Sequence, residues 1–343
     1  MQAERRIEDR GKEPGIRGLA GELRVSNLVE RFGLVFVWLI VIIIFGVKAP
    51  DTFLTRDNFA TIFGSQAVLL VLTLGLLIPL TAGDYDLSVA SILTLSSMLI
   101  GYLNVNDGWP IGLAILVAIL AGAGVGLVNG LIVTFFEIES LIVTLGTGTI
   151  LNGLVLWISN SNTISGISNS LVNLVVEQRF LGISLEFYYG LALTLLLWYF
   201  FEYTAPGRRI LFVGRNRSVA RLSGLRVQRL RVGSLIASGT ISGLAGALYA
   251  GTIGSADPTS GIAFLLPAFA AAFLGTTTIV PGRFNPWGSF TAVYFLVTGI
   301  TGLTILGAQN FVQDLFYGAA LVVGVVLSQI ARWRSARQSR AKA

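Results

Sequence analysis

The sequence predicts an all-α integral membrane protein with about ten transmembrane helices, and three observations support this prediction. Hydrophobic residues make up 54% of the 343 residues, charged residues only 12%, and the mean hydropathy is +0.76. An ordinary globular chain carries about 25% charged residues. A bilayer core about 30 Å thick takes about 20 apolar residues per helix, so the chain has room for about ten spans, loops and tails.

Apolar runs of the required length predict the individual spans. The clear runs lie at 33–48, 111–134, 187–203, 232–251 and 310–330, and weaker ones at 60–82, 87–103, 141–158, 262–279 and 287–307. The first run follows 32 residues that mix seven basic with six acidic side chains, unlike the basic opening of a cleavable signal peptide. We therefore expect an N-terminal tail over 1–32, one transmembrane domain over 33–331 and a basic C-terminal tail over 332–343.

The basic residues predict the orientation, because Lys and Arg near span ends stay on the cytoplasmic side. Seven of the 24 basic residues lie in 1–32, eight in 205–231 and five in 332–342. Six predicted spans separate the first two segments and four separate the last two, so all three share one side. Both termini and the loop 205–231 are thus expected in the cytoplasm, and the Ser- and Asn-rich loop near 159–186 outside. We attribute the net charge of +6 to this topology and to anionic lipid headgroups, not to nucleic acid.

The missing residue types exclude several functions. With no Cys and no His, the chain lacks the residues for thiolate or imidazole metal sites, Cys nucleophiles and His bases. No segment matches the phosphate-binding pattern G-x-x-x-x-G-K-[ST], so ATP hydrolysis is not expected on this chain. The sequence therefore predicts neither an enzyme nor a cofactor.

The cytoplasmic loop 205–231 carries eight Arg, no acid and a short helix signature. Asn216 is suited to cap a helix, Val219, Ala220 and Leu222 form a small apolar face, and Gly224 is suited to end it in the left-handed conformation. Such a helix fits docking onto another protein. The alternative is a basic linker that lies against lipid headgroups.

Two polar interruptions fall inside the apolar regions. Residues 83–88, Gly-Asp-Tyr-Asp-Leu-Ser, carry two carboxylates, which at membrane depth persist only in a loop, a cavity or a paired site. They form either a tight turn in which Asp86 caps the next helix or a proton- or cation-coupling site, although no second intramembrane charge nearby supports the coupling site. Thr144, Thr147 and Asn152 interrupt another span with hydroxyl and amide groups. These groups either donate hydrogen bonds to backbone carbonyls or line a water-filled passage for a polar solute.

Small residues and tryptophans mark contacts of the predicted helices. Gly122, Gly126 and Gly130 repeat at every fourth position, as do Gly239 and Gly243, so these helices are expected to approach a neighbour closely. Tryptophans stand near span ends, where an interfacial belt is expected, at Trp109, Trp157, Trp198 and Trp287.

Taken in order, five segments resemble the permease subunits of bacterial ABC importers of the ribose, xylose and autoinducer-2 group, which are related to branched-chain amino acid permeases. They are GDYDLSVAS at 83–91, NGLIV at 129–133, IVTLGTGTILNG at 142–153, GRRILFVGRNRSVARLSGLRV at 207–227 and LGTTTIVPGRFNPWG at 274–288. The resemblance runs from about residue 35 to 330. It implies a complex in a bacterial plasma membrane of two permeases, two ATPases and an extracytoplasmic solute-binding protein that imports a monosaccharide or similar small polar solute.

The resemblance also implies residue roles. The ATPase-coupling loop of the family aligns with Arg215, Asn216, Arg217, Ser218, Val219, Ala220, Arg221, Leu222 and Gly224. We expect the translocation path at the interface of two permeases, lined by Asp86, Ser88, Asn129, Thr144, Thr147 and Asn152. The chain departs from the family at Asp84, where a second Gly is usual, at Glu139-Ser140, which replaces a Pro pair, and at Thr276, which replaces a Gly.

Two other interpretations remain open from the sequence. A secondary transporter driven by an ion gradient would use Asp84 or Asp86 as its coupling carboxylate. A membrane scaffold without transport activity would use the basic loop to hold a partner.

Overall fold

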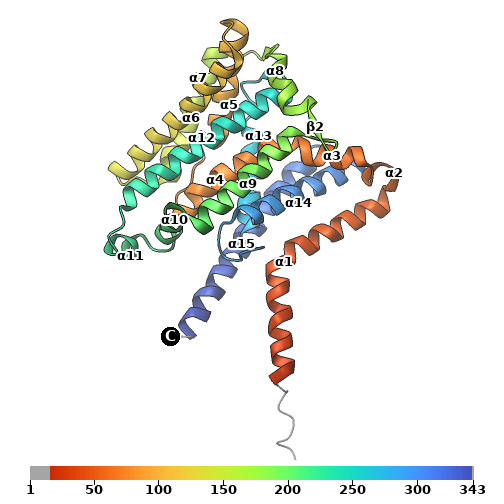
Figure 1. The fold of residues 1–343 in the computed structure, drawn as a ribbon, viewed down its shortest axis with the longest axis vertical. Helices are drawn as coiled ribbons and strands as arrows, with labels where there is room; N and C mark the ends of the chain where they lie inside the picture. Colours follow the sequence, from red (N-terminus) through yellow and green to blue (C-terminus); the bar gives the residue numbers. More distant parts are fainter. Residues whose placement is uncertain (1–15, 342–343) are drawn as a thin grey trace, which may run out of the picture.

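The computed structural model describes residues 16–341 and the side chains of 31–330, so the expectations for 1–15 and 342–343 lie outside the described residues. The fold is a bundle of helices with short connections (Figure 1). The helices are α1 (Ile16–Lys48), α2 (Pro50–Phe53), α3 (Arg56–Ser65), α4 (Ala67–Ala82), α5 (Val89–Gly101), η3 (Tyr102–Asn106), α6 (Ile111–Phe135), α7 (Ser140–Ser159), α8 (Asn169–Val172), η4 (Asn173–Glu177), α9 (Leu185–Tyr203), α10 (Ala205–Arg215), α11 (Arg217–Leu222), α12 (Val227–Ile253), α13 (Ile262–Gly275), α14 (Pro286–Ile305) and α15 (Phe311–Ala341).

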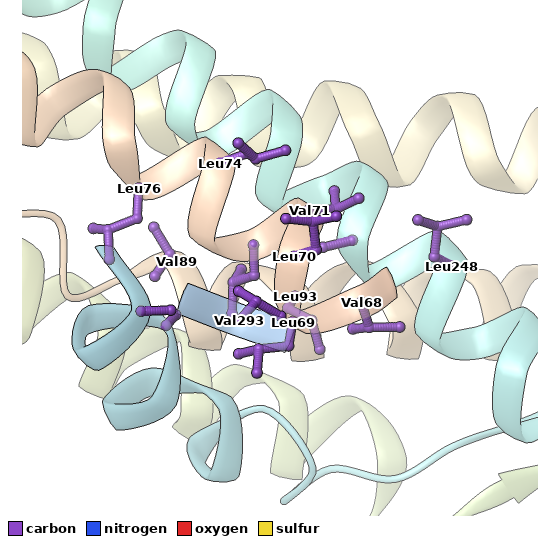
Figure 2. Close-up of a cluster of buried hydrophobic side chains, with 14 of the residues drawn as sticks. Val68, Leu69, Leu70, Val71, Leu74, Leu76, Val89, Leu93, Leu248 and Val293 are labelled. Carbon is purple, nitrogen blue, oxygen red and sulfur yellow. The ribbon is translucent and has the colours of Figure 1, made fainter. Parts of the chain in front are cut away.

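Helix α4 is the centre of the bundle. Its sequence is apolar on every side, and all 16 of its residues are buried, as expected for a helix that other helices surround. Helices α5, α9, α12, α13 and α14 all pack against it. Figure 2 shows part of one hydrophobic cluster, in which Val68, Leu69, Leu70, Val71, Leu74 and Leu76 of α4 lie with Val89 and Leu93 of α5, Leu248 of α12 and Val293 of α14.

Eight helical segments among the described residues are long and apolar enough to cross a membrane. They include every predicted span except 187–203 and 262–279. Helix α9 covers the first of these with 19 residues but is less apolar, and α13 covers the second with only 14. At 1.5 Å per residue, α13 is about 21 Å long, shorter than a bilayer core of about 30 Å. Helix α1 begins at Ile16, well before the predicted start of the first span at 33.

The segments that connect the helices lie at two opposite ends of the bundle. At one end the two-residue strands β1 (Ile164–Ser165) and β4 (Ser255–Ala256) pair antiparallel, so the loop after α7 meets the end of α12. Within the same loop, the strands β2 (Arg179–Phe180) and β3 (Ile183–Ser184) pair antiparallel as a small hairpin. At the other end lie the beginning of α12, the segment α10–α11 and the connections after α4 and α13.

The predicted small-residue contact is confirmed between α6 and α12. A Cβ on Gly126 would lie 2.9 Å from Ile236 Cα, and Gly122 and Gly239 each face the carbonyl of the other. Only glycine allows two helix backbones to come this close. These glycines therefore pack two helices of one chain together.

Candidate functional site

The connection after α4, residues 83–88, is here called the first break. Helix α4 ends when Gly83 adopts a left-handed conformation with φ 82°, and the Asp84 N–H donates to Pro79 O at 2.9 Å. This C-cap turns the chain sharply. The two carboxylates point inward as a result, and the side chains of Asp84 and Asp86 are 1% and 0% exposed.

Asp84 binds two arginines from the basic loop. Arg231, in the first turns of α12, donates from Nε to Oδ2 at 2.8 Å and from Nη2 to Oδ1 at 2.7 Å. Arg217, the first residue of α11, donates from Nη2 to Oδ1 at 2.9 Å and to Gly83 O at 2.6 Å. A buried carboxylate is tolerated when it is paired and hydrogen-bonded in this way. These three residues are here called the Asp84 cluster.

The Asp84 cluster corrects the sequence-based view that no second charge lies near the carboxylates. Its arginines are 133 and 147 residues away from Asp84 in the sequence. One signal pointed to them: the loop 205–231 contains eight Arg and no acid, so a buried acid elsewhere was the available partner. Because Asp84 is held by two cations, it is unsuited to carry a coupling ion, which removes one of the two carboxylates that a secondary transporter would use.

Asp86 connects the first break to α6 and α12. Its Oδ1 accepts from the Ser88 N–H at 3.0 Å and from Ser88 Oγ at 2.5 Å, and its Oδ2 accepts from Ser238 Oγ of α12 at 2.8 Å. Asn129 Nδ2 of α6 donates to Ser88 Oγ at 3.0 Å. Asp86 thus forms a tight turn before α5 and anchors it to α12, but the prediction that it caps α5 is wrong, because Ser88 is the N-cap residue and no side chain caps that helix.

The beginning of α7 holds the backbone of the first break. Ser140 Oγ accepts from the Tyr85 N–H at 2.9 Å, and Thr144 Oγ1 accepts from the Leu87 N–H at 3.0 Å. Small hydroxyl side chains therefore replace the backbone partners that a continuous helix would have supplied. Ser140 was noted in the sequence only as a departure from the family.

Four of the six residues expected to line a path are brought together by the first break, namely Asp86, Ser88, Asn129 and Thr144. All four are buried inside the chain and bond to the break or to one another. The other two lie further along α7: Thr147 donates to Val143 O at 2.9 Å, and Asn152 is half-buried. Whether any of the six faces the path stays a prediction.

The basic loop forms two helices. The short helix predicted from Asn216 is confirmed as α11, because Asn216 Oδ1 accepts from the Val219 N–H at 3.0 Å and Gly224 has φ 80°. Ala220 is buried against Val213 and Val227, whereas Leu222 is 89% exposed.

Helix α10, which the sequence analysis did not predict, fixes the position of α11 against the first break. Thr204 Oγ1 caps α10 by accepting from the Gly207 N–H at 3.2 Å. Gly214 lies directly against Thr81 O at the end of α4, where a side chain would not fit. Most of the expected coupling residues point outward, but Arg217 points toward Asp84.

The connection after α13, residues 276–285, is here called the second break. Asn285 Oδ1 accepts from the Gly288 N–H at 2.7 Å and so caps α14, while its Nδ2 donates to Gly275 O and Thr278 O, both at 3.2 Å. The Ile279 N–H donates to Arg31 O of α1 at 2.7 Å. Arg283 forms an ion pair with Glu202 of α9, and burial lowers the pKa of its guanidinium from the ordinary value.

Among the described residues, no group of three or more acidic side chains could hold a metal ion. What the arrangement offers is mechanical: an exposed helix whose first residue is ion-paired to a turn between two buried helices. A displacement of α11 would act directly on Asp84.

Comparisons with known proteins identify related chains. The sequence profile of the family described as "Branched-chain amino acid transport system / permease component" matches residues 58–325. The chain is 30% identical to the D-allose transport system permease protein AlsC of Escherichia coli K12 over 92% of this chain and 97% of that protein. It is 31% identical to the ribose import permease protein RbsC of Bacillus subtilis over 90% and 95%, respectively. It is 29% identical to the L-arabinose ABC transporter permease protein AraH of Azospirillum brasilense over 90% of each chain. No solved structure matches the chain.

Proposed function

The chain belongs to the family of branched-chain amino acid transport system permease components, and from that premise we propose that it carries a monosaccharide or similar small polar solute. It is a multi-pass permease subunit of an ABC importer in the inner membrane, not an enzyme, and ATP is hydrolysed on a separate subunit. Relatives named for D-allose, ribose and L-arabinose support a sugar as the solute.

The observation that carries the mechanism is the Asp84 cluster. In the proposed mechanism the ATPase docks on the exposed face of α11, which presents Ser218, Val219, Arg221 and Leu222. Arg217 then passes movement of α11 to the first break through Asp84. Arg231 makes the beginning of α12 part of the same unit. Closure of the ATPases would in this way shift α4, α5 and α12 as one body between two packings.

The solute path lies between two permeases in this proposal. Four buried residues, Asp86, Ser88, Asn129 and Thr144, set the shape of the first break. Thr147 and Asn152 are less buried, and they offer hydrogen bonds from α7 at the subunit interface. Weak, multiple hydrogen bonds suit a path that must release its solute, because the solute-binding protein supplies affinity.

The proposed topology keeps ten crossings with both termini in the cytoplasm. Support comes from the contacts of residues 83–88, 217–231 and 276–285, which place the basic loop and both breaks at one end of the bundle. Helix α13 would then cross where surrounding helices bury its second half, and α9 would cross with one side exposed. The solute-binding protein would dock at the opposite end, near the paired strands β1 and β4.

The proposed function is tested by solute uptake. The permease is purified from native membranes with the ATPase that accompanies it, reconstituted in proteoliposomes with ATP inside, and supplied outside with the solute-binding protein and labelled D-allose, ribose or L-arabinose. Uptake of one sugar that requires ATP and survives collapse of ion gradients supports the proposal. Uptake that survives ATP depletion but is lost with the gradient contradicts it. The matched control replaces 217–224 by a flexible linker and should lose the ATPase.

A further inference from the structure

A cavity of about 350 Å³ opens beside the second break. Its wall includes Arg31 of α1, Trp198 and Glu202 of α9, and Trp287 of α14. Arg31 is also the first residue of the stretch of α1 that is apolar enough to span a membrane. The cavity therefore lies where three helices meet at the end of the bundle that carries the basic loop.

The charge left free in this wall is positive. Glu202 is neutralised by its ion pair with Arg283. The exposed Arg31 guanidinium forms no ion pair with another side chain between residues 31 and 330, and it lies 5.5 Å from the centre of the Phe32 ring. Trp287 lies in the first turn of α14, so the N-terminus of this helix borders the cavity and adds its partial positive charge. An anion is thus the favoured ligand.

The second break fixes the wall before any ligand binds. Arg31 O accepts from the Ile279 N–H at 2.7 Å and from Thr278 Oγ1 at 2.9 Å, which holds α1 against the break. Ile279, itself part of the wall, has φ 60°, a conformation that β-branched residues rarely adopt. A rigid wall of this kind is suited to a small polar group.

The surroundings of the cavity suit a lipid better than a soluble anion. Trp198, Tyr203 and Trp287 are amphipathic rings of the type found at the membrane–water boundary. Helix α14 contacts both α1 and α9 (Figure 1), and these two helices expose apolar side chains such as Phe36, Ile40 and Leu196. Acyl chains that continue from a headgroup in the cavity would meet this apolar surface.

We propose that this cavity binds the phosphate headgroup of an anionic phospholipid, with Arg31 as the phosphate ligand. The site is separate from the Asp84 cluster and from the proposed solute path. A bound headgroup would join α1, α9 and the second break.

The proposal is tested by native mass spectrometry of the full chain, released from detergent that contains phosphatidylglycerol and phosphatidylcholine. Wild type should retain phosphatidylglycerol preferentially, and Arg31→Gln should weaken this binding by about tenfold, because a charge-assisted bond to phosphate is lost. Arg229→Gln, an exposed arginine of α12 at the same end of the bundle, is the matched control and should bind like wild type.

A second variant should change lipid binding in the opposite direction. Glu202→Gln frees the Arg283 charge and should strengthen binding of phosphatidylglycerol by several-fold. A decrease instead would show that the positive charge of this wall does not attract the headgroup and would overturn the proposal, as would equal retention by wild type, Arg31→Gln and Glu202→Gln. Glycerol phosphate, which lacks acyl chains, separates the two sources of phosphate. If it displaces the lipid at equal concentration, the ligand is a soluble phosphate ester and the lipid assignment fails.

Discussion

The first and second breaks occupy similar places in the fold but are held in different ways. Each follows a helix whose last residues are buried, α4 or α13, and leads into another helix of the bundle, α5 or α14. Side chains from α6, α7, α11 and α12 hold the first break, and two of the contacts are ion pairs with a buried carboxylate. The second break is held mainly by its own Asn285 and by the backbone of α1, with one ion pair to α9.

This difference indicates different roles. A turn that is bonded to four helices moves only together with them, so the first break is suited to transmit a displacement of α11. The second break has fewer polar contacts with its neighbours and borders a cavity. It is suited to present a preformed wall to a ligand rather than to transmit a displacement, and the variants that follow test this contrast.

The largest effect is expected when a cation is removed from the first break. Arg231→Leu should lower the free energy of unfolding by about 3 kcal/mol, near the lower end of the cost of breaking a buried pair, because Arg217 still binds Asp84. Unfolding of the purified protein by added denaturing detergent measures this. Arg229→Leu removes an exposed arginine from the same helix. A loss of stability of equal size in this variant would show that the Asp84 cluster contributes no more to stability than an exposed arginine does.

The next effect concerns the end of α11. Gly224→Trp should abolish uptake and binding of the ATPase, since the new side chain projects where the ATPase docks. Membrane insertion should be preserved, because a Cβ at Gly224 meets nothing within 4 Å. Co-purification of the ATPase with the inserted variant measures the effect.

The matched control for Gly224→Trp is Gly108→Trp. Gly108 also has a positive φ and open space around it, but it lies at the opposite end of the bundle. The Gly108→Trp variant should therefore retain the ATPase. Normal ATPase binding by Gly224→Trp would remove α11 from the docking site.

A smaller effect is expected for the contact that joins α11 to the first break. Arg217→Gln should reduce uptake by about tenfold, with little change in stability because its side chain is 40% exposed. Uptake by Arg217→Gln, Asp84→Asn and the double variant forms a double-mutant cycle. The double variant should be no worse than Asp84→Asn alone, whereas effects that multiply would show that the two residues act independently.

The smallest effect is expected at the second break. Asn285→Ala removes the cap of α14 and should lower stability by about 1–2 kcal/mol, the usual cost of losing an N-cap. The same unfolding experiment applies. A loss larger than that of Arg231→Leu would reverse the contrast between the two breaks.

Local sequence patterns predicted much of the fold. Apolar length located eight of the ten predicted spans, glycine spacing predicted that α6 and α12 each approach a neighbour closely, and Asn216 with Gly224 predicted α11, because each of these depends on residues close in the sequence. Helix α10 was not predicted, since its arginines obscured the apolar face formed by Ile210 and Val213.

The Asp84 cluster was beyond such patterns. Asp84 and Arg231 are 147 residues apart, and only the packing of α4, α5 and α12 brings them together. The same holds for Ser238, which no motif singled out and which binds Asp86. The sequence showed that two carboxylates required a loop, a cavity or a paired site, but neither which of these was present nor which residues paired with them.

In the proposed mechanism, Arg217 transmits the movement of the ATPase to the membrane helices. The most direct measurement is the number of solute molecules imported per ATP hydrolysed in proteoliposomes, for wild type, Arg217→Gln and the exposed control Arg226→Gln. We expect Arg217→Gln to continue to hydrolyse ATP but to import less solute per ATP, while Arg226→Gln keeps the wild-type ratio. An unchanged ratio in Arg217→Gln would show that Arg217 does not transmit the movement.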